Sequence, residues 1–177
     1  MAEFVITAGH SDVDPGAVAG PIREEAIAQE FRNILAAKLR AMGHRVITDG
    51  EPAVNRPLAD ALRLIRPGAV ANVEIHTNAA SNPTAGGVEC ISLPKDKLLS
   101  QRLSRAVARV LELRVRGDGG WIDQRQSHRG RLAFVERGGL ILELFFLSNP
   151  AERKVYEDRK WLVASAVANV LDLEAEL

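Results

Sequence analysis

Short strand-like runs that alternate with segments of helical periodicity constrain the fold of this chain more than any other feature. Five short runs are rich in apolar or β-branched residues, and most of them end at glycine, proline or polar residues: Phe4–Ala8, Arg45–Thr48, Ala69–Ile75, Val88–Ser92 and Leu140–Leu147. Runs of this length between turn residues are typical of strands. Leu140–Leu147 is the most apolar of the five, and we expect it at the centre of a sheet. Leu132–Val135 is a further candidate strand.

Segments with the period of a helix lie between these runs, namely Arg23–Met42, Leu58–Ile65, Leu98–Leu111 and a last one from Asn149-Pro150 to about Leu173. Asn149 is a favourable N-cap, and a proline is tolerated at the first helical position. Residues 10–22 and 114–130 are expected to be loops. Alternating strands and helices predict the α/β class, here a three-layer domain with a mostly parallel, mixed central sheet flanked by helices. No repeat or linker divides residues 1–177, which predicts a single domain.

Composition excludes several classes of protein. The 177 residues carry 23 Lys and Arg against 23 Asp and Glu, so no overall basic excess favours nucleic acid as a partner. The only cysteine, Cys90, excludes a disulfide scaffold. No run approaches the roughly 20 apolar residues of a membrane span, and the N-terminus lacks the basic start and apolar run of a secretory signal. The chain is therefore expected to be cytoplasmic when it is made and to have no membrane partner.

Four side chains are candidates for chemistry. His10 follows the first expected strand, Glu24 opens the first helix and His76 ends the third strand, and sites in open α/β sheets gather beyond the carboxyl ends of strands. Two histidines and one carboxylate with a fourth position for water make the pattern of a catalytic zinc ion. The alternatives are histidines held by backbone partners and a Glu24 that favours the helix dipole. Glu143 lies inside the most apolar run, where it is either a functional carboxylate or a strand-edge partner of an arginine.

Five segments resemble, in order, the motifs of the zinc-dependent N-acetylmuramoyl-L-alanine amidases of the amidase 3 family. The opening VITAGHSDVDPG, at Val5–Gly16, resembles the family's apolar strand followed by Gly-His and then Asp-Pro-Gly-Ala. Glu24 matches a glutamate at the start of the first long helix. Further matches are Ile75–Ala79 (IHTNA), Gly87–Glu89 (GVE) and Leu142–Asn149 (LELFFLSN). The resemblance covers nearly the whole chain.

This resemblance implies a phosphorylase/hydrolase-like fold and a single catalytic Zn²⁺ bound by His10, Glu24 and His76. It also implies that Glu143 is the catalytic carboxylate, which accepts a proton from an activated water and passes it to the leaving amine. The substrate would be peptidoglycan. The bond cleaved would be the amide between N-acetylmuramic acid and the L-alanine of the stem peptide.

The chain departs from the family pattern near these residues. Ser11-Asp12 stand where the family commonly has Gly-Gly, and Asp12 is expected either to contact a ligand or to cap a turn. Glu25 follows Glu24 directly, and we favour Glu24 as the ligand. Glu74 replaces a serine found in many members. It would lie on the face of His76, beside the metal or paired with a loop arginine. Asn78 is a candidate substrate contact, and His128 a candidate groove residue or a solvated side chain.

The absence of a signal and of a separate wall-binding domain favours a phage endolysin that degrades the host cell wall and needs a holin for release. We expect a monomer that acts at the cell wall or periplasm. The alternatives are a bacterial amidase for wall remodelling and a non-catalytic muropeptide-binding module. Residues 95–131 hold ten Lys and Arg against four acids. This local excess could hold the enzyme on an anionic wall, and salt would weaken it.

Overall fold

The computed structural model describes residues 1–51, 53–127 and 130–177. The strands are β1 (Glu3–Ala8), β2 (Val18–Ala19), β3 (Ile22–Arg23), β4 (Arg45–Thr48), β5 (Ala71–Asn78), β6 (Glu89–Ser92), β7 (Trp121–Asp123) and β8 (Leu140–Phe146). The α-helices are α1 (Glu24–Ala41), α2 (Leu58–Leu64), α3 (Lys97–Leu111), α4 (Ala133–Glu136) and α5 (Pro150–Glu174).

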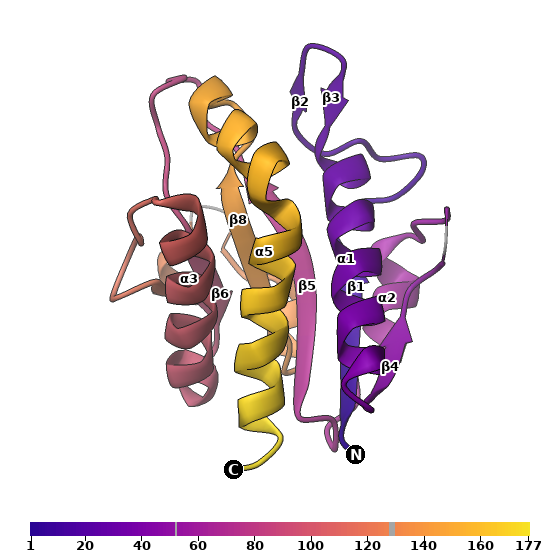
Figure 1. The fold of residues 1–177 in the computed structure, drawn as a ribbon. Helices are drawn as coiled ribbons and strands as arrows, with labels where there is room; N and C mark the ends of the chain where they lie inside the picture. Colours follow the sequence, from indigo (N-terminus) through magenta and orange to yellow (C-terminus); the bar gives the residue numbers. More distant parts are fainter. Residues whose placement is uncertain (52, 128–129) are drawn as a thin grey trace.

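The central sheet has six strands in the order β4-β1-β5-β8-β6-β7 (Figure 1). The first four are parallel, β6 is antiparallel to β8, and β7 is parallel to β6. The last two strands therefore run against the other four, which confirms a mostly parallel, mixed sheet. β2 and β3 form a separate two-stranded hairpin.

Helices α1, α3 and α5 cover one face of the sheet, while α2 lies on the other (Figure 1). The short helix α4 contacts α2 and β8 on that second face. The main core fills the space between the sheet and the three long helices. Alternate residues of the central strands point into it, as expected for the two-residue period of a strand. Examples are Ile6 of β1, Ile75 of β5 and Leu142 of β8, each fully buried. The three layers that the sequence predicts are therefore present.

Most of the predicted elements are confirmed, and the differences have local causes. The candidate strand at Leu132–Val135 is wrong, because the amides of Glu136 and Arg137 bond to the carbonyls of Leu132 and Ala133 and close the single turn of α4. The predicted loop at 10–22 contains the hairpin β2–β3, and the one at 114–130 contains the edge strand β7. The Asn149 cap is confirmed, since its side chain accepts from the amides of Ala151 and Glu152.

A buried ion pair fixes the carboxyl end of β1. The side chains of Arg32 and Asp49 are fully buried, and Nη1 of the arginine lies 2.8 Å from Oδ1 of the aspartate. Both carboxylate oxygens also accept from the amide of Ala8, two residues before His10. Burial raises the pKa of Asp49, and the charge and hydrogen bond of Arg32 only partly offset it. Removal of one partner would leave the other charged and buried.

Replacement of Asp49 by alanine is therefore expected to lower the free energy of unfolding by about 3–5 kcal/mol. Urea denaturation followed by circular dichroism measures this. The control is Arg63→Ala, which breaks the exposed pair with Asp60 and should cost less than about 1 kcal/mol. Equal losses in the two variants would contradict a special role for the buried pair.

The lone cysteine is chemically protected. Cys90 of β6 is fully buried, and burial raises its pKa from 9.0 to about 12. At pH 8 the thiolate fraction falls from about a tenth to about 10⁻⁴. We expect Cys90 to react at least about a thousandfold more slowly with a disulfide reagent in the native chain than in guanidinium, as measured by absorbance. Rapid stoichiometric labelling of the native chain would contradict this burial.

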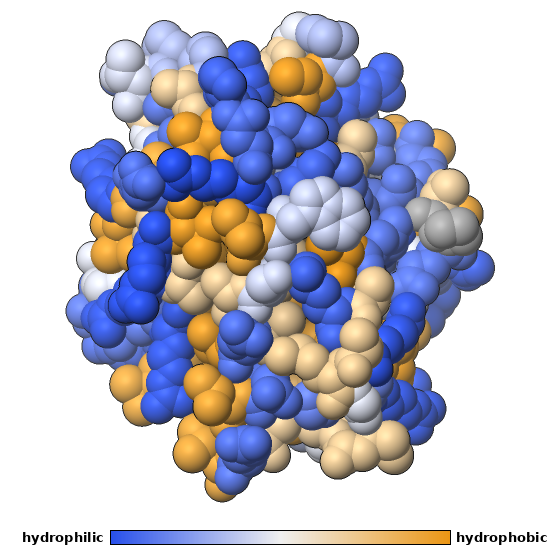
Figure 2. Space-filling model, in the orientation of Figure 1, coloured by the Kyte–Doolittle hydropathy of each residue, from blue (hydrophilic) through white to orange (hydrophobic). Residues whose placement is uncertain are grey.

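The surface over the three long helices mixes apolar and charged residues. Figure 2 shows apolar areas surrounded by hydrophilic ones on this face. The arginine stripe of α3 (Arg102, Arg105 and Arg109) lines a cavity of about 480 Å³ beside α5, and Arg102 pairs with Glu174. Among the described residues, no helix is long and apolar enough to cross a membrane.

Candidate metal-binding and catalytic site

The candidate site residues of β5 and β8 lie on the face of the sheet opposite the three long helices. Ile75 and Leu142 point into the main core, so their neighbours His76 and Glu143 point the other way. In the register of these two strands, His76 is directly opposite Glu143. The structure therefore brings together two residues that are 67 positions apart in the sequence.

His10 takes an unusual backbone conformation directly after β1. Its φ is 66°, in the left-handed region that residues with a side chain adopt only when their surroundings hold them there. A Cβ atom on Gly9 would lie 2.2 Å from the ring of His76, and one on Gly16 would lie 2.5 Å from the ring of His10. Both glycines are therefore required where the chain passes close to the histidines.

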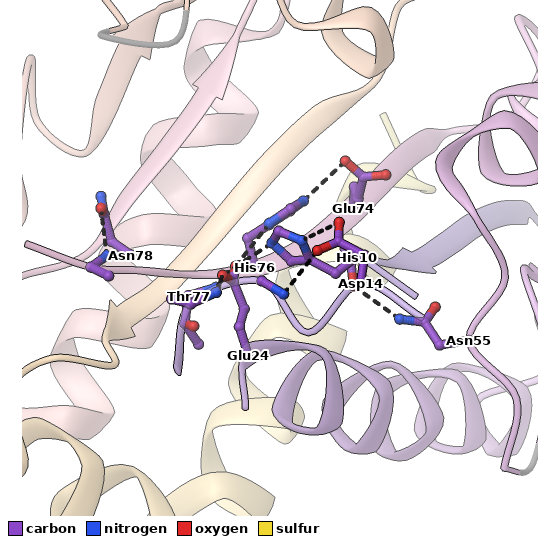
Figure 3. Close-up of polar contacts among 12 residues, drawn as sticks. His10, Asp14, Glu24, Asn55, Glu74, His76, Thr77 and Asn78 are labelled. Atoms are coloured by element: carbon purple, nitrogen blue, oxygen red, sulfur yellow. Dashed lines mark hydrogen bonds and ion pairs between the residues drawn. The ribbon is translucent and has the colours of Figure 1, made fainter. Parts of the chain in front are cut away.

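Glu24 is held between the two histidines. It opens α1, is fully buried, and has Oε2 3.0 Å from Nε2 of His10 and Oε1 3.0 Å from Nδ1 of His76. The amide of Ala17 donates to Oε2 and that of Thr77 to Oε1. Each carboxylate oxygen is thus oriented by one backbone donor and faces one histidine (Figure 3).

Each histidine has a second carboxylate at its other ring nitrogen. Nδ1 of His10 lies 3.1 Å from Oδ2 of Asp14, and Nε2 of His76 lies 3.1 Å from Oε2 of the buried Glu74. A carboxylate behind a histidine fixes the tautomer and makes the facing nitrogen a better metal ligand. This leaves Nε2 of His10 and Nδ1 of His76 as the two ring nitrogens that face Glu24.

The three residues fit a zinc ion. One ligand atom from each of His10, Glu24 and His76 lies within 4.8 Å of the other two. Nε2 of His10 is buried and, within the described part of the chain, lacks a hydrogen-bond partner, although Oε2 of Glu24 is 3.0 Å away. Two facing acceptors suit a bridging cation, and two histidines with one carboxylate form the donor set of a catalytic zinc site with an open position.

The electrostatics of the metal-free cluster show that a metal would have to displace protons from the histidines. Burial pulls down the pKa values of His10 and His76, but the neighbouring carboxylates of Glu24, Asp14 and Glu74 outweigh it, so both are raised. Burial acts to raise the pKa of Glu24, and the two histidines hold it well below its usual range. Protons therefore compete with a metal here, and zinc affinity should fall as the pH falls.

Two neighbouring cavities lie beside the candidate site residues. One, of about 350 Å³, is lined by His10, Glu74 and His76 and by residues of α2 and α4. The other, of about 320 Å³, is lined by Glu143 and by residues of β6 and the loops around it. Leu132 and Ile141 line both. These two adjoining cavities, which share part of their wall, are together called the groove: the histidines line one part and the buried Glu143 lines the other.

The other predicted site residues fall in different places. Asp12 is exposed and accepts from the amide of Asn55, so it anchors a loop instead of contacting the cluster. Asn78 ends β5, lines the second cavity and donates to Glu89 at 3.0 Å. Of the two adjacent glutamates, Glu24 and not Glu25 lies in the cluster. His128 lies outside the described residues.

Three residues beside the cluster and the groove have no predicted role from sequence reasoning. Asp14 orients His10, Glu89 faces Glu143 in the register of β6 and β8, and Arg116 bonds Glu89. Asp14 and Glu89 are the polar residues of the Asp-Pro-Gly and Gly-x-Glu motifs. Their positions in these motifs are the sequence signal that could have identified them as site residues. Arg116 lies in a Gly-rich loop and has no such signal.

Comparisons with known proteins agree on one family. The family model described as N-acetylmuramoyl-L-alanine amidase matches residues 4–172. A crystal structure from Neisseria meningitidis, provisionally described as that of such an amidase, shares 41% identity over 99% of this chain and 96% of its own, with a TM-score of 0.90. None of the curated proteins matches the chain.

More distant structures share the fold. The catalytic domain of CwlV, an N-acetylmuramoyl-L-alanine amidase from Bacillus (Paenibacillus) polymyxa var. colistinus, has 20% identity and a TM-score of 0.84, with 99% of each chain covered. The catalytic domain of the CD27L endolysin, which targets Clostridia difficile, has 18% identity and a TM-score of 0.72, with 97% of each chain covered.

Proposed function

The chain belongs to the N-acetylmuramoyl-L-alanine amidase family, and on that premise we propose that it is a zinc-dependent hydrolase of peptidoglycan. Its substrate bond is the amide between N-acetylmuramic acid and the L-alanine of the stem peptide. The observation that carries the proposal is the convergence of His10, Glu24 and His76, with Glu143 directly opposite His76 on the neighbouring strand.

In the proposed mechanism His10, Glu24 and His76 would hold Zn²⁺, which would supply a Lewis acid for activation of water and polarisation of the amide carbonyl. Asp14 and Glu74 keep the two histidines in the tautomers that bind metal. Glu143, buried beside the cluster, accepts a proton from the attacking water. It then donates a proton to the nitrogen of the leaving L-alanine, so it ends the cycle ionised as it began.

Digestion of purified peptidoglycan, followed by mass spectrometry, tests the proposal. The expected products are free stem peptides that begin with L-alanine and glycan strands that retain intact N-acetylmuramic acid. Cuts between two residues of the stem would instead identify a zinc peptidase with the same fold. Binding of muropeptides without any cleavage by the zinc-loaded chain would identify a non-catalytic module.

For the biological role we propose host-cell lysis, with bacterial wall remodelling as the alternative. The chain shares its fold with the catalytic domain of an endolysin, which is compatible with a role in lysis. It also shares its fold with a bacterial amidase, which is compatible with a role in remodelling. Production in a Gram-negative host with and without a holin separates the two. An endolysin should cause a sharp loss of turbidity only when the holin is present, and lysis should require Glu143.

A further inference from the structure

Arg116 is fixed at the wall of the second cavity by contacts on several sides. Its Nε donates to Oε2 of Glu89 at 2.5 Å, and its Nη1 lies 3.4 Å from the carbonyl oxygen of Gly86. The guanidinium lies over the ring of Phe146, 4.9 Å from the centroid. The amide of Arg116 also donates to the carbonyl of Val88. Little entropy is therefore lost when this side chain binds a ligand.

One edge of the guanidinium is available to the cavity. Nη2 of Arg116 donates to none of the residues that the structure describes, and the side chain is 34% exposed. The cavity beside it is lined mostly by small or apolar residues, among them Ala79, Ala85 and Ile91. A planar guanidinium with a free edge pairs with a carboxylate in a defined geometry.

The charges along the groove are unequal. Among the described residues no Lys or Arg lines the cavity beside the histidines, whereas Arg116 lines the cavity beyond Glu143. The substrate of the proposed reaction is also asymmetric, because the peptide on the nitrogen side of the scissile amide carries free carboxylates. The cavity with Arg116 also holds the carboxylates of Glu89 and Glu143, so its net charge does not attract an acidic peptide. Arg116 is nevertheless the one cation among its described lining residues that can bond a peptide carboxylate at short range.

The register indicates which carboxylate is within reach. Glu89 is directly opposite Glu143, so their Cβ atoms are about 5 Å apart. Arg116 lies one side-chain contact beyond Glu89, and an extended peptide advances about 3.5 Å per residue. Since Glu143 serves the nitrogen of L-alanine, the guanidinium lies near the stem residue that follows it.

We propose that Arg116 is a specificity-determining residue that binds the free α-carboxylate of the stem residue after L-alanine. This inference rests on the proposed amidase function. Glu89 neutralises Arg116 at long range, so the discrimination comes from short hydrogen bonds and should depend only weakly on salt. An amidated carboxylate would place an N–H donor against the guanidinium and would bind less well.

The test compares two disaccharide tetrapeptides that differ only in whether this α-carboxylate is free or amidated. The zinc-loaded wild-type chain should have a kcat/KM about tenfold higher on the free acid, mostly through KM. In Arg116→Gln the ratio of the two kcat/KM values should fall to about one. Arg116→Lys, which keeps the charge but loses the planar fork, should give an intermediate ratio.

Arg114→Gln is the matched control. Nε of Arg114 donates to the same Gly86 carbonyl at 3.2 Å, but the side chain does not line the cavity, so the tenfold ratio should remain. A wild-type ratio near one, or an unchanged ratio in Arg116→Gln, would overturn the role of Arg116 while leaving the amidase function intact. Cleavage of neither compound would overturn both proposals.

Discussion

Replacement of Glu143 by glutamine is expected to lower kcat on peptidoglycan by about 10²–10⁴-fold, because the variant loses the group that moves the proton. The change keeps the size and shape of a side chain that is 3% exposed within β8. Fold and bound zinc should therefore be retained. Release of soluble peptide measures the rate, and circular dichroism and elemental analysis measure the other two properties.

The matched control for this variant is Glu157→Gln on α5. This substitution also removes one carboxylate from the chain. Glu157, however, is exposed, pairs with Lys160 of the same helix, and lies on the side of the sheet opposite Glu143. Its rate should equal that of the wild type. A Glu143→Gln enzyme that is folded, contains zinc and keeps more than about a tenth of the wild-type rate would remove Glu143 from the proposed mechanism.

A second large effect is expected at the two adjacent glutamates that open α1. Glu24→Gln should reduce bound zinc from about one ion per chain to below about a tenth, because a neutral amide is a poor replacement for the carboxylate ligand. Activity should be lost with the metal. Zinc is measured by elemental analysis after dialysis, and activity is measured by peptide release before and after zinc is added back.

Glu25→Gln is the control for this prediction, since it changes the neighbouring residue in the same first turn of the helix. Glu25 lies outside the cluster, so this variant should keep both zinc and activity. The opposite result, zinc lost from Glu25→Gln and kept by Glu24→Gln, would show that the two residues exchange roles in solution. Full zinc in both variants would remove this helix end from the metal site.

The sequence predicts most of the fold because the signals for its elements are local. The strand β4 follows from the adjacent β-branched residues Val46 and Ile47. The beginning of α5 follows from the Asn149 cap and the proline after it. Short elements are harder to predict. The three residues of β7 become a strand only by pairing with β6, and a four-residue helix such as α4 has too few residues to show a period.

The site divides in the same way. His10, Glu24 and His76 stand at element ends or within motifs, so sequence reasoning reaches them. The contact of Glu74 with His76 was one of two alternatives, and the structure decides between them. The Glu89–Arg116 pair depends on a loop more than 20 residues away that lies beside β6, where Val88 bridges Val115, and this leaves no pattern in the sequence.

The reversed direction of β6 and β7 separates the groove into two parts that could evolve independently. The cavity beside the histidines is built largely from residues 10–76, whereas the cavity with Arg116 is built largely from residues 78–127, and among the described residues they share Leu132 and Ile141. Under the proposed function, substitutions in the second segment can change which peptide is accepted without disturbing the proposed metal ligands. Exchange of residues 112–127 between relatives is thus a direct route to enzymes with new wall preferences.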